Sequence, residues 1–217
     1  MNSTARYRRG FTLIEVLVSA TVLAVTLGSV TLSMRQGAAS WQANLAAGSL
    51  DSKTELTLDR ITRYLESASG KSLRPDLSAT PFSSWVDFQE TTGYRDGTRF
   101  LSEARRIELE LVPGELDNGL DDNGNGLVDE CRVVLIQDLD GDQIRVVIAR
   151  GVRKYLQGES GNGRDDNGNG LIDEPGLSFD ADGNTLNIRI TLEKAGPTGD
   201  LLTRTLEGSI TLLNLGK

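Results

Sequence analysis

Residues 8–20 read "RRGFTLIEVLVSA", and this stretch opens the segment that decides the fold. Glu15 is the only charged residue within residues 11–34, and nineteen uncharged residues follow it. At about 1.5 Å of helical rise per residue, those nineteen residues span roughly 28 Å, close to the thickness of the hydrocarbon core of a bilayer. A buried helix of a soluble domain rarely runs this long without a polar face. The sequence therefore predicts a membrane-spanning helix over residues 11–34.

The residues before this run are basic. Residues 1–10 contain Arg6, Arg8 and Arg9 and no acidic residue. Because Lys and Arg favour the cytoplasmic side of a membrane, we expect a cytoplasmic N-terminus, a single pass through the inner membrane, and export of the rest of the chain. A cleaved secretory signal is the competing interpretation, with a weak small-residue cleavage site near Ala38–Ala39.

Helical periodicity continues over residues 35–70. Apolar residues of this stretch recur at intervals of three or four within two groups: Trp41 and Leu45, then Leu58, Ile61 and Leu65. Such a stripe is typical of an amphipathic helix. No proline precedes Pro75, and Gly70 is a plausible stop signal. We expect one helix from about residue 12 to about residue 68, whose second half, from about residue 40, packs on an exported domain.

The first quarter of the chain resembles a known family. The basic leader, Gly10 and the following "FTLIEVLVSATVLAV" are similar to the N-termini of type IV prepilins and type II secretion pseudopilins. The resemblance implies that a prepilin peptidase removes residues 1–10 by cutting between Gly10 and Phe11, and that the new amino group of Phe11 is methylated. Other pilin or pseudopilin subunits are then the expected partners.

The resemblance also implies a role for Glu15, which would neutralise the N-terminal amine of a neighbouring subunit during assembly. Both charges are costly alone in hydrocarbon, and pairing relieves both. The competing interpretation places Glu15 near the cytoplasmic interface, where its side chain reaches water. The tip-capping pseudopilin of type II secretion typically lacks this glutamate, so its presence argues against that position in a filament.

Residues 71–217 form the predicted exported domain. After a serine- and proline-rich loop, segments with period-2 patterning and β-branched residues predict strands at 85–89, 105–112, 131–137, 144–150, 185–193 and 204–214. Segment 151–157 is either a short helix or a strand continuation. We expect an α+β, pilin-like fold, in which a mainly antiparallel sheet packs on the second half of the helix.

Composition limits the function classes. The chain of 217 residues carries a net charge of −8, and without the leader 20 basic residues face 31 acidic ones. An acidic domain argues against nucleic-acid binding. The chain has no histidine and no recognisable nucleophile arrangement, so we expect no enzymatic activity. Cys131 is the only cysteine, which excludes an intrachain disulfide.

The domain contains an internal repeat. Loop 1 (residues 117–130) reads "DNGLDDNGNGLVDE" and loop 2 (residues 161–174) reads "GNGRDDNGNGLIDE", with eleven of fourteen positions identical at an offset of 44. Both lie between predicted strands and are predicted loops. Two shorter Asp-Gly segments, 138–143 and 180–185, also look like metal loops, but Asp-Gly between strands favours hairpin turns.

The repeat has the spacing of calcium ligands. Candidate ligands at positions 1, 3, 5, 7, 9 and 10 are Asp121, Asn123, Asn125, the carbonyl of Leu127, Asp129 and Glu130 in loop 1, and Asp165, Asn167, Asn169, the carbonyl of Leu171, Asp173 and Glu174 in loop 2. Ca²⁺ binds six to eight oxygen ligands of these kinds, and glycine at position 6 permits the sharp turn of such loops. The side chains of Leu127 and Leu171 are expected to anchor the loops.

The repeat departs from an EF-hand because position 12 is Arg132 or Gly176 instead of glutamate, and no flanking helices are predicted. It is more similar to the shorter calcium loops of secreted proteins such as thrombospondin type 3 repeats. With Asn replacing Asp we expect weak affinity, about 10⁻⁴–10⁻³ M. A solvated Asn-Gly-Asp turn without an ion is the alternative.

Taken together, the sequence predicts a minor pilin or pseudopilin of a type IV pilus or type II secretion pseudopilus. Its domain would be periplasmic or part of an extracellular filament and stabilised by Ca²⁺. The alternative function is a membrane-tethered, calcium-dependent binding module that does not polymerise. Glu15 discriminates between them, because a simple tether has no use for a carboxylate at that depth.

Overall fold

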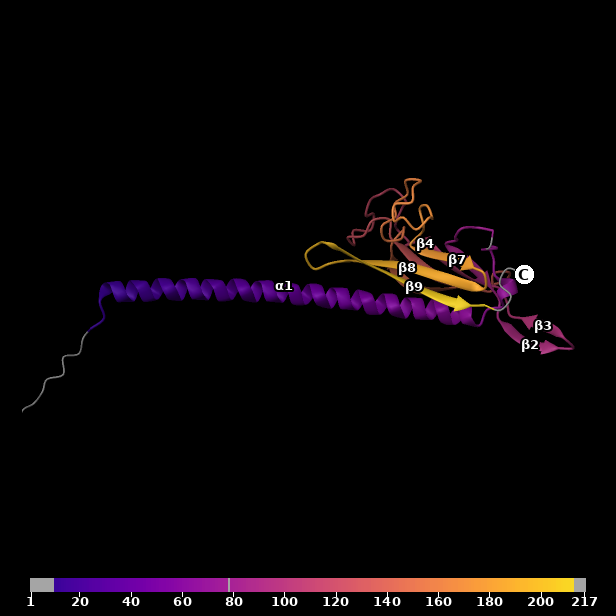
Figure 1. Cartoon of the computed structure of the whole chain (residues 1–217), viewed down its shortest axis with the longest axis horizontal. Coiled ribbons are helices and arrows are strands. Elements are labelled where there is room, and N and C mark those ends of the chain that lie inside the picture. Colours follow the sequence, from indigo (N-terminus) through magenta and orange to yellow (C-terminus); the bar gives the residue numbers. More distant parts are fainter. Residues whose placement is uncertain (1–9, 78, 213–217) are drawn as a thin grey trace, which may run out of the picture. The chain divides into compact units, whose positions relative to one another are not determined.

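The computed structural model describes residues 10–77 and 79–212 and confirms the predicted α+β architecture (Figure 1). A single helix, α1 (Leu13–Glu66), is followed by a 3₁₀ turn, η1 (Gly70–Ser72), and nine strands. The chain divides into two compact units, residues 1–45 and 46–217. Helix α1 begins in the first unit and ends in the second, and it is the single helix that the periodicity predicted.

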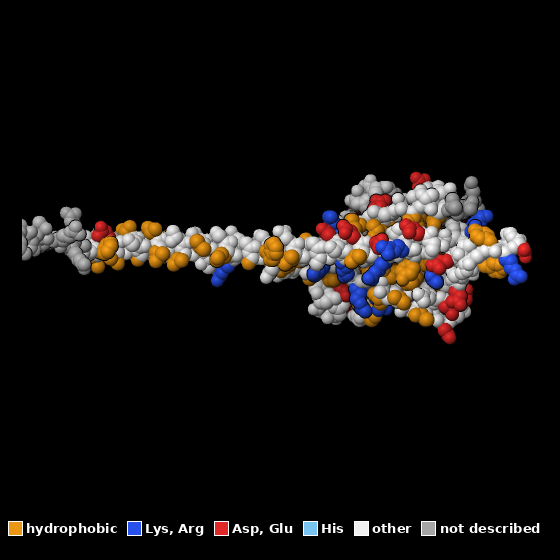
Figure 2. Space-filling model, turned by 90° about the horizontal axis from the view of Figure 1, so that it is seen from below, with side chains coloured by type: hydrophobic (Ala, Val, Ile, Leu, Met, Phe, Trp, Pro, Cys, Tyr) orange, Lys and Arg blue, Asp and Glu red, His pale blue; other side chains and the backbone are white. Residues whose placement is uncertain are grey.

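In the first unit, α1 has no polar face of its own. Its most apolar 18-residue window has a mean hydropathy of 2.1, none of it is buried, and α1 is the one helix among the described residues that is long and apolar enough to cross a membrane. Hydrophobic side chains follow one another along it on the face shown in Figure 2. Hydroxyl groups donate back to helix carbonyls at Ser19, Thr21, Thr26, Ser29 and Thr31. These bonds satisfy polar groups that hydrocarbon could not.

In the second unit, the last five turns of α1 contribute one buried stripe to the core. Its members are Leu50, Thr54, Thr57, Ile61 and Leu65. The buried hydroxyls of Thr54 and Thr57 each donate to the carbonyl four residues earlier, at 2.8 Å, so they carry no unmet hydrogen bond. The predicted stripe began too early, because Trp41 and Leu45 belong to the first unit and are 67% and 57% exposed.

The strands are antiparallel throughout. Their bounds are β1 Trp85–Phe88, β2 Thr91–Arg95, β3 Thr98–Leu101, β4 Arg105–Leu111, β5 Cys131–Gln137, β6 Ile144–Val152, β7 Leu177–Asp182, β8 Thr185–Ala195 and β9 Leu201–Thr211. Seven of them form one sheet in the order β1-β4-β5-β6-β8-β7, with β9 also paired to β8, and β2 and β3 form a separate hairpin. Ser83 and Phe179 exchange two backbone hydrogen bonds of 2.8 Å, which join the chain before β1 to β7.

The helix packs on this sheet through apolar side chains from most of its strands. Gly208 of β9 lies against Leu58, and a Cβ at residue 208 would come within 3.3 Å of the leucine methyl groups. Phe88, Val133, Phe179 and Ile188 are fully buried in the same core. The predicted packing of the sheet on the second half of the helix is thus confirmed, with Leu50 as the first buried residue.

All six predicted strands are confirmed within three residues at the described ends. Segment 151–157 is a strand only as far as Val152, where β6 ends, and then a loop. The Asp-Gly segments 138–143 and 180–185 form the turns between β5 and β6 and between β7 and β8, as predicted. Strand β7 and the β2–β3 hairpin were not predicted. The hairpin turns at Asp96–Gly97, both with positive φ (51° and 76°), as a two-residue type I′ turn requires.

Candidate functional site: the twin loops and the N-terminal segment

Loop 1 connects β4 to β5 and loop 2 lies between β6 and β7, and both are long excursions without helix or strand (Figure 1). The two loops share one backbone conformation. The φ angle is 75° at Gly119 and 74° at Gly163, and it is 90° at both Gly126 and Gly170. Side chains are strained in this left-handed region. Glycine at position 6 of each loop therefore meets a real conformational need.

Position 1 organises each loop. In loop 1 the Oδ1 atom of Asp121 accepts the N–H groups of Gly124 (2.7 Å) and Asn125 (3.1 Å), and its Oδ2 accepts that of Gly126 (2.8 Å). Asp165 accepts the matching three N–H groups, from Gly168, Asn169 and Gly170. The hydrogen bond from Gly126, helped by the others, lowers the pKa of Asp121. Asp121 is therefore an anion at neutral pH.

The side chains at positions 3, 5 and 10 meet one another. In loop 1 the Nδ2 atom of Asn125 donates to Glu130 Oε2 at 2.6 Å, and Nδ2 of Asn123 lies 3.4 Å from Glu130 Oε1. Loop 2 repeats this arrangement with Asn167, Asn169 and Glu174. Glu130 is only 5% exposed, so amide groups satisfy a carboxylate that water hardly reaches. A half-turn of each amide would present its oxygen in place of its NH₂ group, but it would break the bonds that Asn123 Oδ1 and Asn125 Oδ1 accept from the N–H groups of Asn125 and Leu127.

Positions 7 and 9 have other partners. Leu127 N–H donates to Asn125 Oδ1 (2.9 Å) and its side chain is buried, whereas Leu171 makes the matching bond but stays partly exposed. Asp129 accepts the N–H groups of residues 118 and 119 at 3.0 Å, and Asp173 accepts those of residues 162 and 163. The backbone of both aspartates lies in the left-handed region, with a φ angle of 48° at Asp129 and 53° at Asp173. Position 9 therefore shapes the first turn of each loop and is not brought to the side chains at positions 3, 5 and 10.

Two buried glutamates outside the predicted pattern support the loops. Glu115 and Glu159 are 44 residues apart, the offset of the repeat, and their Oε1 atoms accept the N–H groups of Asn123 and Asn167, each at 3.0 Å. Glu115 is 6% exposed and Glu159 is 2% exposed. The sequence carries a signal for them, because the dipeptide Gly-Glu precedes both loops at the same offset. The repeat is thus longer than its Asn- and Gly-rich part.

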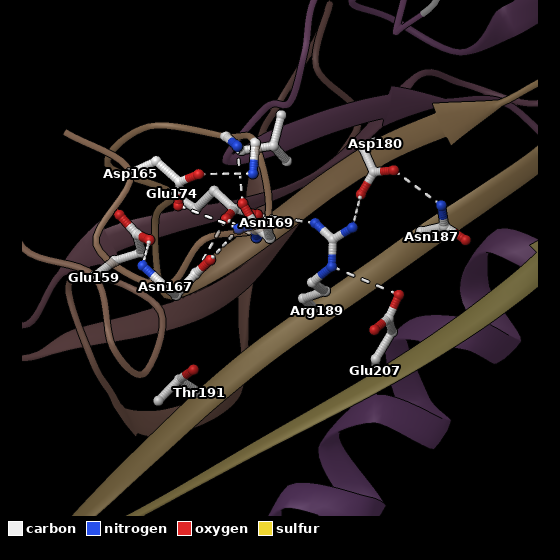
Figure 3. A network of polar contacts seen from close by, with 12 residues as sticks. Glu159, Asp165, Asn167, Asn169, Glu174, Asp180, Asn187, Arg189, Thr191 and Glu207 are labelled. Carbon is white, nitrogen blue, oxygen red and sulfur yellow. Dashed lines mark hydrogen bonds and ion pairs between the residues drawn. The ribbon is translucent and has the colours of Figure 1, made fainter. Parts of the chain in front are cut away.

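Loop 2 has a cationic side chain at its carboxylate. Arg189 of β8 places Nη1 at 2.9 Å from Oε1 of the fully buried Glu174, and its other nitrogens face Asp180 of β7 (2.9 Å) and Glu207 of β9 (3.5 Å). Figure 3 shows the guanidinium group between these three carboxylates, with Asn169 on the loop side. The pairing of a buried carboxylate with a guanidinium is a strong, charge-assisted contact.

Loop 1 faces a groove instead. Asn123, Asn125 and Glu130 line a groove of about 810 Å³, and its other walls include Leu50, Lys53, Arg150, Glu193 and Lys194. Within the described part of the chain, Lys and Arg form no ion pair with Glu130. Burial, reinforced by the charge of Glu130 and opposed by Arg153, raises the pKa of Glu193 to about 7. The groove thus holds a second acidic group that costs free energy when ionised.

The donor chemistry of the loops fits a hard cation. Among residues 10–77 and 79–212, no three His, Cys, Asp or Glu side chains are grouped so that they could hold a metal ion. A cation would therefore need asparagine and backbone oxygens as well, which is the mixed oxygen set that Ca²⁺ accepts. In loop 1 such oxygens belong to Asp121, Asn123, Asn125 and Glu130, and this donor set contains no nitrogen or sulfur ligand.

At the N-terminus, α1 begins with a capping box. Thr12 Oγ1 accepts the N–H of Glu15 (3.3 Å), and Glu15 Oε2 accepts both the N–H and the hydroxyl of Thr12 (2.9 Å each). Gly10 and Phe11 precede the helix in exposed, non-helical backbone. The predicted cleavage bond is therefore accessible. Arg6, Arg8 and Arg9 of the predicted leader lie outside the described residues.

Comparison with protein families gives a match at the N-terminus. The prokaryotic N-terminal methylation motif matches residues 5–31. This motif is characteristic of the prepilin-type signal of type IV pilins and pseudopilins, and the match confirms the resemblance seen in the sequence. No curated protein and no solved structure matches the chain.

Proposed function

We propose that this protein is a minor pilin or pseudopilin, a structural subunit of a type IV pilus or a type II secretion pseudopilus. The methylation motif supports a processed, pilin-like subunit. The observation that carries the proposal is the division of α1. Its first part is apolar and exposed in the single chain, while its last five turns are built into the core of a domain. Exposed apolar surface on this scale needs a bilayer or neighbouring subunits to cover it.

Processing and location follow from the same helix. A prepilin peptidase would cut between Gly10 and Phe11, and methylation of the Phe11 amine would follow. The basic leader would hold the N-terminus in the cytoplasm, and the sheet domain would lie in the periplasm or in an assembled filament. The competing secretory site at Ala38–Ala39 lies inside the unbroken α1. The family of the motif is structural, and we propose no catalytic role.

Glu15 has two roles in this proposal. Within one chain its carboxylate caps α1 through Thr12, and in a filament it would also pair with the N-terminal amine of a neighbouring subunit. The carboxylate is not buried in the single chain, so it can reach a partner. Glutamine at the third position of a capping box keeps the cap but lacks the charge. Glu15→Gln therefore separates the two roles.

The test follows the full chain in its native host. Mass spectrometry of the membrane fraction should show Phe11 as the first residue, with a methylated amine. Glu15→Gln should insert into the membrane normally and fail to co-purify with filaments, whereas Glu55→Gln, an exposed change on the same helix, should behave as wild type. A mature chain starting near Ser40, or wild-type incorporation of Glu15→Gln, would overturn the proposal for the filament.

We further propose that Ca²⁺ stabilises the twin loops. The support is the matching conformation of both loops, the convergence of positions 3, 5 and 10, and the all-oxygen donor set. A bound ion would supply folding stability to a domain that has no disulfide, by about 2.7 kcal/mol per site when Ca²⁺ is 100-fold above Kd. Calorimetric titration of the chelator-treated full chain in detergent tests this part, and an absence of binding at several millimolar Ca²⁺ would remove it.

A further inference from the structure

One edge of strand β6 has no strand beside it for most of its length. Strand β6 pairs with β5 from Ile144 to Val152, but on its other side it pairs with β8 only at Val152. Within residues 10–77 and 79–212, no other strand pairs with residues 144–151. An unpaired strand edge presents backbone N–H and C=O groups to which a further strand can bond.

Helix α1 lies beside this open edge, and two of its basic side chains contact the edge carbonyls. Lys53 Nζ donates to the carbonyl of Arg150 at 2.6 Å, and Arg60 Nη1 donates to the carbonyl of Ile148 at 3.5 Å. Lys53 and Arg60 are exposed. Their side chains have several rotatable bonds, so they can turn aside for an incoming backbone.

A groove runs between α1 and the open edge. Its two parts, of about 660 and 410 Å³, share Arg60, Val147 and Ile148 as lining residues. Leu56 of α1 and Val146 of β6 also line it, and they are 59% and 41% exposed. Volumes of this size are typical of binding sites. The groove therefore offers apolar contacts next to unpaired backbone groups.

The groove is basic in a domain that is acidic as a whole. The charged residues that line its two parts are all cations: Lys53, Arg60, Arg63 and Arg150. Arg63 pairs with Asp59 at 2.9 Å, whereas the other three form no ion pair in the described part of the chain. Charge complementarity therefore favours an acidic partner.

We propose that an extended, acidic segment of a neighbouring subunit binds in this groove as an added strand along β6. Its apolar side chains would pack on Leu56 and Val146, and its carboxylates would face Arg60 and Arg150. In such strand addition, main-chain hydrogen bonds give affinity and alternate side chains give specificity. The source of the segment rests on the proposed function, because α1 carries both this groove and the exposed apolar surface that neighbouring subunits would cover.

The first test uses the full chain in detergent and a labelled synthetic peptide of alternating glutamate and valine. About seven residues, at about 3.3 Å each, span the open edge. Fluorescence anisotropy should show saturable binding. The same peptide with every backbone nitrogen methylated cannot donate edge hydrogen bonds, so it should bind at least about tenfold more weakly. A peptide of alternating lysine and valine should not bind.

Two variants change the groove at exposed positions, and thermal melting checks that each still folds. Leu56→Ser should weaken peptide binding by about tenfold, because it removes apolar contact area. Arg60→Glu should weaken it by about fivefold or more, and the loss should shrink at high salt. Lys71→Glu, a matched change outside the groove, should bind as wild type. In the native host, Leu56→Ser should co-purify with filaments less than Lys71→Glu does.

The inference is overturned if wild type does not bind the peptide at millimolar concentration, or if the methylated peptide binds equally well. It is also overturned if Lys71→Glu weakens binding as much as Arg60→Glu, or if Leu56→Ser enters filaments as wild type does. Each of these results leaves the tests of Phe11 processing and of Glu15→Gln unaffected. Failure of those tests would instead overturn the filament role, and with it a neighbouring subunit as the source of the segment.

Discussion

Loops 1 and 2 share eleven of fourteen residues and one backbone conformation, yet the buried glutamate at position 10 has different charged neighbours in the two loops. Strand β8 supplies the difference. It presents Arg189 to Glu174 of loop 2, and it presents Glu193 to the groove that Glu130 of loop 1 lines. Residues four apart on a strand point to the same face, so one face of β8 carries a cation for one loop and an acid for the other.

The comparison shows that a duplicated sequence does not guarantee duplicated chemistry. In loop 2 the protein provides its own counter-charge, and the buried carboxylate is neutralised whether or not an ion is present. In loop 1 the same carboxylate has two amide groups and an acidic neighbour, and the basic residues that line its groove, Lys53, Arg150 and Lys194, form no ion pair with it among the described residues. Ion binding should therefore stabilise loop 1 more than loop 2, because linkage depends on what binds the native state.

The largest expected effect comes from removing the cation of loop 2. Arg189→Gln leaves Glu174 buried without its partner, and breaking a buried ion pair from one side costs about 3–5 kcal/mol. Denaturant unfolding of the full chain in chelator measures the loss. Millimolar Ca²⁺ should restore more stability to this variant than to wild type, because loop 2 then depends on an ion as loop 1 does.

Arg145→Gln is the control for that experiment. Arg145 pairs with Glu108 and Glu110 at the surface, and its side chain is 49% exposed. Glu108 and Glu110 keep their other partners, Arg106 and Arg132, when Arg145 is replaced, so the control should lose no more than about 1 kcal/mol with or without Ca²⁺. Equal losses in the two variants would mean that Arg189 is not the special support of loop 2.

The second prediction concerns pH and the loop 1 side of β8. The pKa of Glu193 is raised to about 7, chiefly by burial, with Glu130 reinforcing and Arg153 opposing the shift. Lys53, Arg150 and Lys194 share its groove. Because the folded state binds this proton more tightly than the unfolded state, the stabilisation is present below about pH 4.5 and is lost as pH rises to about 7.

Glu193→Gln should remove this dependence. The difference in unfolding free energy between wild type and Glu193→Gln, measured in chelator, should change by roughly 3 kcal/mol between pH 4.5 and pH 7, in the direction that favours the variant at the higher pH. Taking the difference cancels the other carboxylates. If this difference in unfolding free energy does not change with pH, ionisation of Glu193 does not destabilise the folded state.

Local patterns predicted most of the fold. The helix, its end near residue 66 and strand β5 at 131–137 follow from periodicity and stop signals within a few residues. Strand β7 and the β2–β3 hairpin were not predicted. They are short and carry several polar or charged residues, so the alternation of apolar and polar residues is weak. Thr54 and Thr57 were not predicted as core, since their burial depends on hydroxyls that bond back to the helix.

The site was predictable where its contacts are local. Four candidate ligands lie within ten residues of one another, and the repeat in the sequence pointed to them: Asp121, Asn123, Asn125 and Glu130. Asp129 carries the right chemistry, but its left-handed backbone turns the carboxylate towards residues 118 and 119. The contributions of β8 are long-range in sequence, and no spacing rule connects residue 189 or 193 to the loops.

The smallest expected effect comes from Lys154, which follows β6 and contacts aspartates of loop 1. Its Nζ atom bonds Asp117 and lies 3.7 Å from Asp129 Oδ2, whereas the position equivalent to Asp117 in loop 2 is Gly161. Burial opposes its charge, but the bond to Asp117 and the nearby carboxylates raise the pKa of Lys154, so it is positive at neutral pH.

A positive charge beside loop 1 repels an incoming cation. Lys154→Gln should therefore tighten the loop 1 calcium step by less than about fivefold, the range of partly exposed charge pairs, and should leave the loop 2 step unchanged. The gain should shrink when the ionic strength rises from 0.01 M to 1 M, because screening weakens the repulsion. Lys71→Gln, a basic residue outside both loops, should change neither step. If Lys154→Gln tightened both steps equally, its charge would act on the domain as a whole, and the electrostatic contrast between the loops would not be local.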